Sequence, residues 1–291
     1  MKVLYYPGCT LKTSAKNFED SAVASLKVLG VDLVELERWN CCGTVYSLAS
    51  DDLMHKVAPI RNLIRVKEQS NGDDRVVTLC SMCYNTLKQA NEFFKEDEES
   101  RDKINNFMDR EIDYNGDVEV LHLLTLLKEE IGFDNIGKKV KNKLSNLKVA
   151  SYYGCLLLRP QNSAIDNAEN PTILEDLFTS LGIDTVDFPY KNECCGSYNT
   201  VNAVDLVVER TYKIINSARS FGANIIATSC PLCQFNLDRR QKDVKDKYYD
   251  FEEMPVVYFT QIMGRAFNVK RKSLGFDLNY IDPVPLLQEN F

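Results

Sequence analysis

The sequence lacks any long apolar run. No window approaches the roughly 18 consecutive apolar residues that would indicate a transmembrane helix, so none is expected. The amino-terminal stretch MKVLYYPGC has one lysine and an apolar run too short for a secretory signal. We therefore expect a cytoplasmic protein. In that reducing compartment, the ten cysteines of the chain are not expected to form structural disulfides.

Familiar cofactor fingerprints are also missing. The chain has no G-x-G-x-x-G motif for a flavin or nicotinamide, and no C-x2-C-x2-C-x3-C-P run of a ferredoxin domain. It has no excess of basic residues, and its net charge of −7 argues against a general nucleic-acid binder. With 291 residues, the chain can bury one large core or two smaller ones. Any electrons that it handles must come from another protein.

What the sequence does contain is a duplicated cysteine pattern. The first five cysteines are spaced C-x31-CC-x37-CxxC and the second five C-x38-CC-x34-CxxC, and a glycine follows each adjacent pair. No cysteine falls outside the pattern, which predicts two copies of one domain, at residues 1–145 and 146–291. The cysteines are Cys9, Cys41, Cys42, Cys80 and Cys83 in the first copy and Cys155, Cys194, Cys195, Cys230 and Cys233 in the second.

Short runs rich in β-branched and aromatic residues predict four strands in each copy. They are KVLYYPG, VDLVEL, RVVTLC and VEVLHL in the first copy, and KVASYYG, IDTVDFP, ANIIATSC and MPVVYFT in the second. Helical patterns lie between them, at 14–29, 51–68, 172–181 and 204–220. This alternation predicts an α/β fold of two tandem domains, each a mainly parallel, Rossmann-like sheet flanked by helices.

The cysteines occupy equivalent places in this predicted fold. In each copy, one follows the first strand, the CCG motif follows the second, and the CxxC motif follows the third. Ligands of open α/β sheets bind at the carboxyl ends of the strands, so three loops are expected to bring five sulfurs together. Pro231 suits the first turn of a helix. Such a helix would direct its N–H groups and the positive end of its dipole at the thiolates.

Several kinds of thiol site can be compared with this pattern. A c-type haem needs histidine after the CxxC motif, where Tyr84 and Gln234 stand, and a zinc ribbon needs two CxxC motifs close together. A thioredoxin-like site leaves three cysteines of each copy unexplained. Thiolate sets select zinc, copper(I) or iron–sulfur clusters. Iron–sulfur clusters are favoured here, with zinc in one or both copies, or buried reduced cysteines, as the alternatives.

With both CCG motifs complete from Cys9 to Cys233, the chain resembles the B subunit of heterodisulfide reductase, an archaeal protein of the CCG-domain family. The resemblance implies that each set of five cysteines binds a non-cubane [4Fe–4S] cluster. It also implies that the two clusters face each other across a pseudo-twofold interface. One cluster would use Cys9, Cys41, Cys42, Cys80 and Cys83, and the other Cys155, Cys194, Cys195, Cys230 and Cys233.

The activity that this resemblance implies is reduction of the coenzyme M–coenzyme B heterodisulfide to two thiols. Each cluster would pass one electron and capture one sulfur. The implied partners are the heterodisulfide reductase component that carries cubane [4Fe–4S] clusters and the component that contains flavin, fed by a hydrogenase or formate dehydrogenase. The alternative is an iron–sulfur electron-transfer or adaptor protein of another CCG-containing oxidoreductase, of the lactate, glycerol-phosphate, fumarate or succinate type.

Three further residues are candidates for the site. His122 follows a predicted strand and is a candidate proton donor, although a histidine in such a place is more often structural. Lys12 and Arg159 come shortly after Cys9 and Cys155, and each is a candidate partner for an anionic group of the substrate. The tail from residue 268 to the end has little helical periodicity, and it is expected either to wrap the chain or to lie on a partner.

Overall fold

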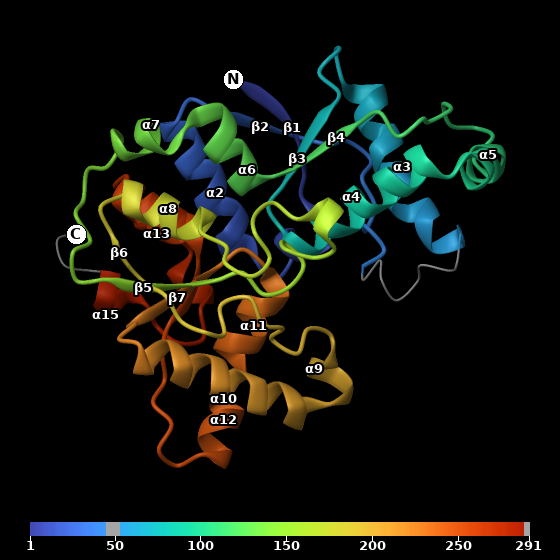
Figure 1. The fold of residues 1–291 in the computed structure, drawn as a ribbon. Coiled ribbons are helices and arrows are strands. Elements are labelled where there is room, and N and C mark those ends of the chain that lie inside the picture. The colour runs from blue at the N-terminus through green and yellow to red at the C-terminus, as the bar shows by residue number, and fades with distance from the viewer. Residues whose placement is uncertain (45–52, 288–291) are drawn as a thin grey trace.

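The protein contains two parallel four-stranded sheets with the same topology (Figure 1). The structure, a computed structural model, describes residues 1–44 and 53–287. The first sheet has the order β2-β1-β3-β4 and the second β6-β5-β7-β8. The strands are β1 (Lys2–Tyr6), β2 (Asp32–Glu35), β3 (Arg75–Thr78), β4 (Glu119–His122), β5 (Lys148–Tyr152), β6 (Asp184–Val186), β7 (Ile225–Thr228) and β8 (Val256–Tyr258). This confirms the predicted fold class and all eight predicted strands.

Helices connect the strands and cover the sheets. The first repeat contains α1 (Gly8–Leu11), α2 (Lys16–Val28), α3 (Leu53–Gln69), α4 (Ser81–Glu96), α5 (Glu98–Phe107), α6 (Leu123–Leu126), the π-helix η2 (Leu127–Ile131) and α7 (Phe133–Gly137). The second contains η3 (Gln161–Ser163), α8 (Ile173–Ser180), α9 (Asn199–Asn202), α10 (Val204–Ser220), α11 (Pro231–Arg239), α12 (Gln241–Lys247) and α13 (Phe259–Ala266). The four predicted helices correspond to α2, α3, α8 and α10, and the predicted start of α3 at 51 and 52 lies outside the described residues.

The two repeats share one continuous hydrophobic core. Helix α13 of the second repeat packs against α2 of the first (Figure 1). The rings of Phe18 and Tyr258 are stacked there with their centroids 4.2 Å apart. The hydroxyl groups of Ser21 and Thr260 hydrogen bond at 2.7 Å nearby. The predicted domain boundary at 145/146 lies between α7 and β5, but the core continues across it.

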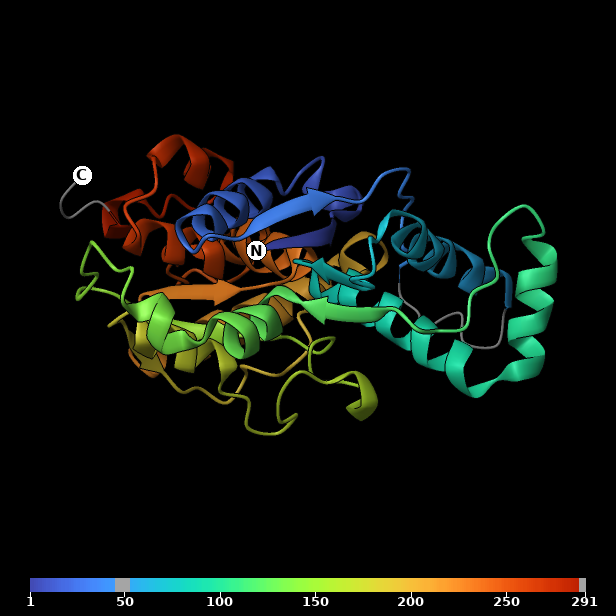
Figure 2. The same ribbon diagram turned by 90° about the horizontal axis from the view of Figure 1, so that it is seen from above.

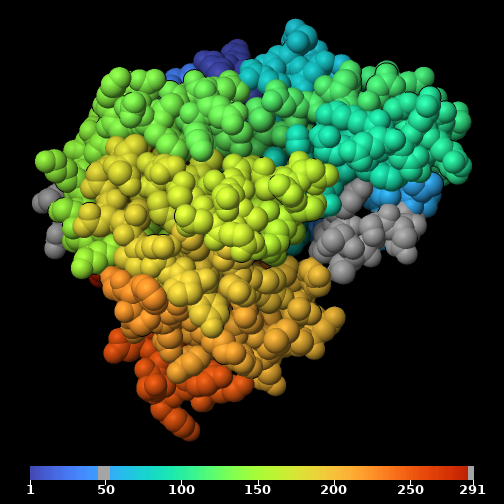
Figure 3. Space-filling view, viewed as in Figure 1, coloured from blue at the N-terminus to red at the C-terminus, as the bar shows by residue number. Residues whose placement is uncertain are grey.

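The close contact between the two repeats is also visible at the molecular surface. In the space-filling view, the segment from about residue 160 to 200 (yellow) lies directly against the first repeat (green) (Figure 3). Helix α5 lies at the periphery of the first repeat, away from the second, in both ribbon views (Figures 1 and 2). No helix among the described residues is long and apolar enough to span a membrane.

The carboxyl-terminal tail wraps the chain itself. It forms α14 (Arg271–Leu274), the 3-10 helix η4 (Phe276–Leu278) and α15 (Val284–Leu287), and α14 packs on α2. The Gln261 side chain donates a hydrogen bond to the Leu274 carbonyl at 2.8 Å, and Arg265 Nε donates to the Leu287 carbonyl at 2.8 Å. Of the two alternatives for the tail, wrapping the chain is therefore the observed one through residue 287.

Candidate metal centre

The cysteines lie at the carboxyl ends of the parallel strands. Cys9 is in α1 directly after β1, and Cys155 follows β5 in the same way. Cys80 and Cys230 are the N-cap residues of α4 and α11, which begin after β3 and β7. Pro231 is at the first position of α11, as predicted. The parallel topology thus brings three cysteine-bearing loops to one edge of each sheet.

Within each set, the sulfur atoms lie in close pairs. The Sγ atoms of Cys9 and Cys41 are 3.9 Å apart, and the Cys42 thiol donates to Cys83 Sγ at 3.6 Å. In the second repeat, the Cys195 thiol donates to Cys233 Sγ at 3.4 Å. All ten cysteines are free thiols. Six are buried, and those with exposed or half-exposed side chains are Cys9, Cys41, Cys155 and Cys194.

The two sets meet where the repeats join. The Ser81 and Ser229 hydroxyl groups are 2.8 Å apart, and the Ser81 amide donates to the Ser229 carbonyl at 3.4 Å. These serines adjoin Cys80 and Cys230. Hydrogen bonding to the Cys230 thiol is the main cause that raises the pKa of Cys80. The two CxxC segments therefore form a direct contact between the two thiol sets.

Helix amino termini and neighbouring thiols favour a thiolate at Cys230. Its pKa lies well below the ordinary value, first because the Cys233 thiol hydrogen bonds to it, with further help from the backbone amides of Leu232 and Cys233. Cys194 has its pKa lowered to about 2, mainly by hydrogen bonding to Cys155, and Arg210 contributes a favourable charge. In the first set, the pKa of Cys42 likewise lies well below the ordinary value, first because Cys41 hydrogen bonds to it. Thiolates are the form that binds metals, so each set has at least one sulfur that favours this form.

Two glycines allow the first-ligand loops to approach the CxxC sulfurs. Gly8 has a φ of +70°, and a Cβ at that position would lie 2.9 Å from Cys83 Sγ. Gly154 has a φ of +65°, and its Cβ would lie 3.1 Å from Cys233 Sγ. A side chain would be strained by the backbone conformation and blocked by sulfur. Glycine at these two positions therefore permits the close approach to sulfur.

The repeated tyrosines have a structural role that sequence reasoning did not assign. The Tyr6 hydroxyl donates to the Asn40 carbonyl at 2.8 Å, and the Tyr152 hydroxyl donates to the Glu193 carbonyl at 2.6 Å. Each bond joins the end of a first strand to the loop just before a CCG motif. The signal was present, because a tyrosine stands three residues before the first cysteine in both copies.

The donor set fits an iron–sulfur cluster better than a single metal ion. A mononuclear zinc site needs three or four ligands within about 2.0–2.3 Å of one point. Each set here has five thiols, one more than a mononuclear zinc ion binds. A cluster distributes its thiolate ligands over several iron atoms. Five thiols on three loops therefore suit a cluster, whose type this arrangement leaves open.

His122 has the environment of a structural histidine. It is fully buried, its Nε2 is 2.9 Å from the Leu79 carbonyl, and its Nδ1 accepts a hydrogen bond from the Leu124 amide at 3.2 Å. Burial lowers the pKa of His122 to about 4, so the ring is neutral at neutral pH. Since both nitrogens are occupied by the main chain, this geometry does not support the predicted role as proton donor.

Both predicted anion-binding residues have oxygen partners within the protein. Lys12 Nζ is 2.6 Å from carboxylate oxygens of both Glu19 and Glu35, which already neutralise it. Arg159 donates to the Asn192 carbonyl at 3.3 Å and pairs with Glu169 at 3.3 Å, on a part-exposed surface. The predicted substrate-binding role has no geometric support at either position, because nearby acidic and carbonyl oxygens take up both cations.

Comparisons with known proteins agree with the duplicated architecture. The cysteine-rich domain family, CCG, matches residues 3–88 and 149–238. The chain is 36% identical to the 8-methylmenaquinol:fumarate reductase membrane anchor subunit of Wolinella succinogenes, over 97% of this chain and 98% of that protein. It is 28% identical to the B subunit of the ferredoxin/F(420)H(2)-dependent CoB-CoM heterodisulfide reductase of Methanosarcina acetivorans, over 98% and 96%.

A solved structure shares the fold. The crystal structure of a hypothetical protein from Helicobacter pylori matches 96% of this chain with a TM-score of 0.73 and 14% sequence identity. This chain spans about half the length of that protein, at 51%. Two complete cysteine sets, each on its own parallel sheet, and matches over both halves lead to one conclusion: the chain belongs to the CCG family of cysteine-rich domain proteins, whose relatives include oxidoreductase subunits.

Proposed function

We propose that this protein is an iron–sulfur electron-transfer subunit of a quinol-linked fumarate or succinate oxidoreductase. The observation that carries the proposal is the 36% identity to a fumarate reductase subunit over nearly the full length of both chains. It exceeds the 28% identity to a heterodisulfide reductase subunit over a similar span. The proposed role is the alternative that the sequence left open. Heterodisulfide reduction, the leading prediction from the sequence, becomes the second candidate.

The site is well suited to passing electrons between two centres. Each thiol set would hold one iron–sulfur cluster, and such clusters transfer electrons one at a time. Cys80 and Cys230 adjoin at the contact between the repeats, so ligands of the two clusters would be neighbours. Cys9, Cys41 and Cys194 are exposed, which would leave an edge of each cluster accessible to a partner protein. Electrons could then enter through one repeat and leave through the other.

Reduction of the coenzyme M–coenzyme B heterodisulfide is the second candidate. It is favoured by the completeness of both thiol sets and by their direct contact. Cleaving one S–S bond consumes two electrons and two protons and releases two thiols. Two clusters beside the bond would supply one electron each. The partners would then be the heterodisulfide reductase components that carry cubane clusters and flavin, with a hydrogenase or formate dehydrogenase upstream.

Metal analysis of anaerobically purified protein tests the common part of both candidates. We expect about eight irons and eight sulfides per chain, the content of two four-iron clusters. About four irons with one zinc would instead make one repeat structural. That result would contradict any mechanism that uses two clusters.

The two candidate functions are distinguished by an experiment on the native complex, which is isolated through an affinity tag on this chain. Menaquinol is added together with fumarate, and reoxidation of the reduced clusters is followed by EPR. Turnover with quinol and fumarate, and no new signal on adding the coenzyme M–coenzyme B disulfide, would support the fumarate or succinate role. A new paramagnetic signal with the disulfide and no response to quinol would overturn it in favour of heterodisulfide reduction.

A further inference from the structure

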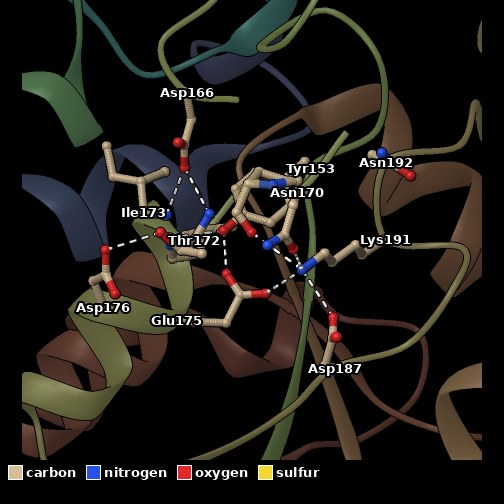
Figure 4. A network of polar contacts seen from close by, with 12 residues as sticks. Tyr153, Asp166, Asn170, Thr172, Ile173, Glu175, Asp176, Asp187, Lys191 and Asn192 are labelled. Atoms are coloured by element: carbon tan, nitrogen blue, oxygen red, sulfur yellow. Dashed lines mark hydrogen bonds and ion pairs between the residues drawn. The ribbon is translucent and has the colours of Figure 1, made fainter. Parts of the chain in front are cut away.

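A network of charged and polar groups lies in the second repeat, with Lys191 and Glu175 largely buried and Asp187 80% exposed (Figure 4). Its centre is Lys191, whose side chain is 8% exposed. The ammonium group is 2.8 Å from an Asp187 carboxylate oxygen and 3.6 Å from one of Glu175. It also donates to the Asn170 side chain at 3.2 Å and to the Pro171 carbonyl at 3.1 Å. Four oxygen atoms therefore hold one cation in a largely buried position.

The network is connected directly to the loop that carries Cys155. The Lys191 carbonyl accepts hydrogen bonds from the Tyr153 amide at 2.8 Å and the Gly154 amide at 3.3 Å. The Tyr153 hydroxyl donates to Glu175 and accepts from the Leu174 amide at 3.0 Å. Tyr153 also lines a small cavity together with Cys155, Cys195, Cys230 and Cys233. One tyrosine thus separates the charged network from the sulfurs.

The side chains of this network are not repeated at the aligned positions of the first repeat. When the cysteines and the LG-V/I-D segments of the two copies are aligned, Tyr153 corresponds to Pro7, Glu175 to Val23 and Lys191 to Arg38. Proline has no amide hydrogen and valine has no charge. The Arg38 side chain is 65% exposed and pairs with Glu68 at 2.5 Å on the surface. The cysteines are duplicated, whereas these three side chains are not; the first repeat instead has the Lys12–Glu19–Glu35 group.

We propose that Lys191 and Glu175 are positioning residues that hold the Cys155 loop and set the reduction potential of the second metal centre apart from that of the first. This inference rests on the proposed function, because it requires a cluster on each thiol set. A charge in a poorly solvated site is weakly screened and acts strongly on its neighbours. The ammonium of Lys191 stabilises an added electron, and the carboxylate of Glu175 opposes it. Arg38, in water, has little such effect.

The test is an EPR-monitored redox titration of anaerobically purified protein carrying Lys191→Met, Glu175→Gln or, as matched control, Arg38→Met. It is performed at pH 8, because burial raises the pKa of Glu175 and the carboxylate must be ionised. We expect Lys191→Met to lower the potential of the second centre and Glu175→Gln to raise it, with no shift of the first centre. Arg38→Met should leave both potentials unchanged. Cys42→Ser and Cys195→Ser assign each signal to its repeat.

Shifts of the second centre's reduction potential in opposite directions indicate an electrostatic effect. Simple loss of structure would instead disturb the second centre in the same way in both variants. Shifts in the same direction, no shift in either variant, or equal shifts of both centres would overturn the inference. Glu175→Gln preserves the shape of the side chain and keeps the test valid if Lys191→Met does not fold. Absence of iron from the wild-type protein would instead refute the proposed function itself, and iron analysis of the same samples reveals that case.

Discussion

The two repeats are alike in their ligands and different in what surrounds them. Both place a tyrosine, a left-handed glycine and five cysteines at the carboxyl edge of a parallel sheet of the same strand order. The first repeat exposes both Cys9 and Cys41, whereas Cys155 of the second is half-buried. The donor sets of the two repeats are therefore alike, and the repeats differ in the solvent exposure of the first cysteine and in the side chains around it.

Lys12 and Lys191 illustrate this difference. Lys12 of the first repeat is 31% exposed and bridges Glu19 and Glu35 at the surface. Lys191 of the second is 8% exposed. Exposed ion pairs contribute only about 0–1 kcal/mol to stability, whereas removing one partner from a buried set leaves charges that are poorly compensated. Lys191 is thus the more buried of the two cations, while Glu19 and Glu175 are shielded to a similar extent, at 13% and 15% exposed.

The largest predicted effect is the loss of one metal centre. Cys42→Ser and Cys195→Ser each remove a buried ligand from one repeat. We expect each variant to retain about half of the wild-type iron, since the other thiol set remains complete. Iron and sulfide analysis with EPR measures this. Loss of all iron in either variant would show that the two centres assemble as one unit. It would contradict the view that each repeat binds its metal independently.

The next effect concerns the pH dependence of stability. Burial raises the pKa of Asp238 to about 7, although Gln234 and the amides of Tyr280 and Ile281 donate to it. Between about pH 4 and 7, the folded state holds a proton that the unfolded chain has released. Stability therefore falls as the pH rises through this window, by up to about 4 kcal/mol.

Asp238→Asn should flatten this pH dependence, as measured by urea unfolding between pH 4 and 8. The matched control is Lys88→Met, at the equivalent position in the first repeat, where the lysine pairs with Glu92 at 3.4 Å on a partly exposed face. The control should keep the wild-type slope. An unchanged slope in Asp238→Asn would mean that another group governs the pH response.

A smaller effect is expected from filling the left-handed glycine positions. Gly8→Ala and Gly154→Ala should each destabilise the protein by at least about 1–2 kcal/mol, the cost of a side chain in this backbone region. The loss should be larger at Gly8, because its Cβ would lie 2.9 Å from sulfur rather than 3.1 Å. Urea unfolding of both variants measures the two losses of unfolding free energy and shows which is larger. Equal losses would indicate that backbone strain alone, and not the contact with sulfur, determines the cost.

The smallest effect is at the contact between the repeats. Ser229→Ala leaves the buried Ser81 hydroxyl without its partner at 2.8 Å, which should cost about 1–2 kcal/mol. The double variant Ser81→Ala/Ser229→Ala should lose less than the sum of the single variants, because no hydroxyl is then left unpaired. Additive losses in a double-mutant cycle would show that the two serines do not interact in solution.

Much of the fold and of the site was predictable because it depends on local pattern. Alternating strand and helix signals imply parallel sheets, and parallel sheets place the residues after each strand at a common edge. The positions of the ten cysteines and the helix start at Pro231 follow from that rule. The roles suggested for His122, Lys12 and Arg159 stay predictions. Sequence proximity to a cysteine did not reveal the oxygen atoms that partner these side chains in the fold.

The duplicated α/β architecture, the duplicated cysteine pattern and the family could be predicted from the amino-acid sequence alone. These depend on periodicity and spacing, which local backbone geometry converts directly into structure. Only the tertiary structure decided that Ser81 meets Ser229, that the tail returns to Asp238, and that Lys191 is buried beside Glu175. These contacts join residues far apart in the chain. Such contacts depend on how complete surfaces pack together and exclude water, so they cannot be predicted from a local sequence pattern.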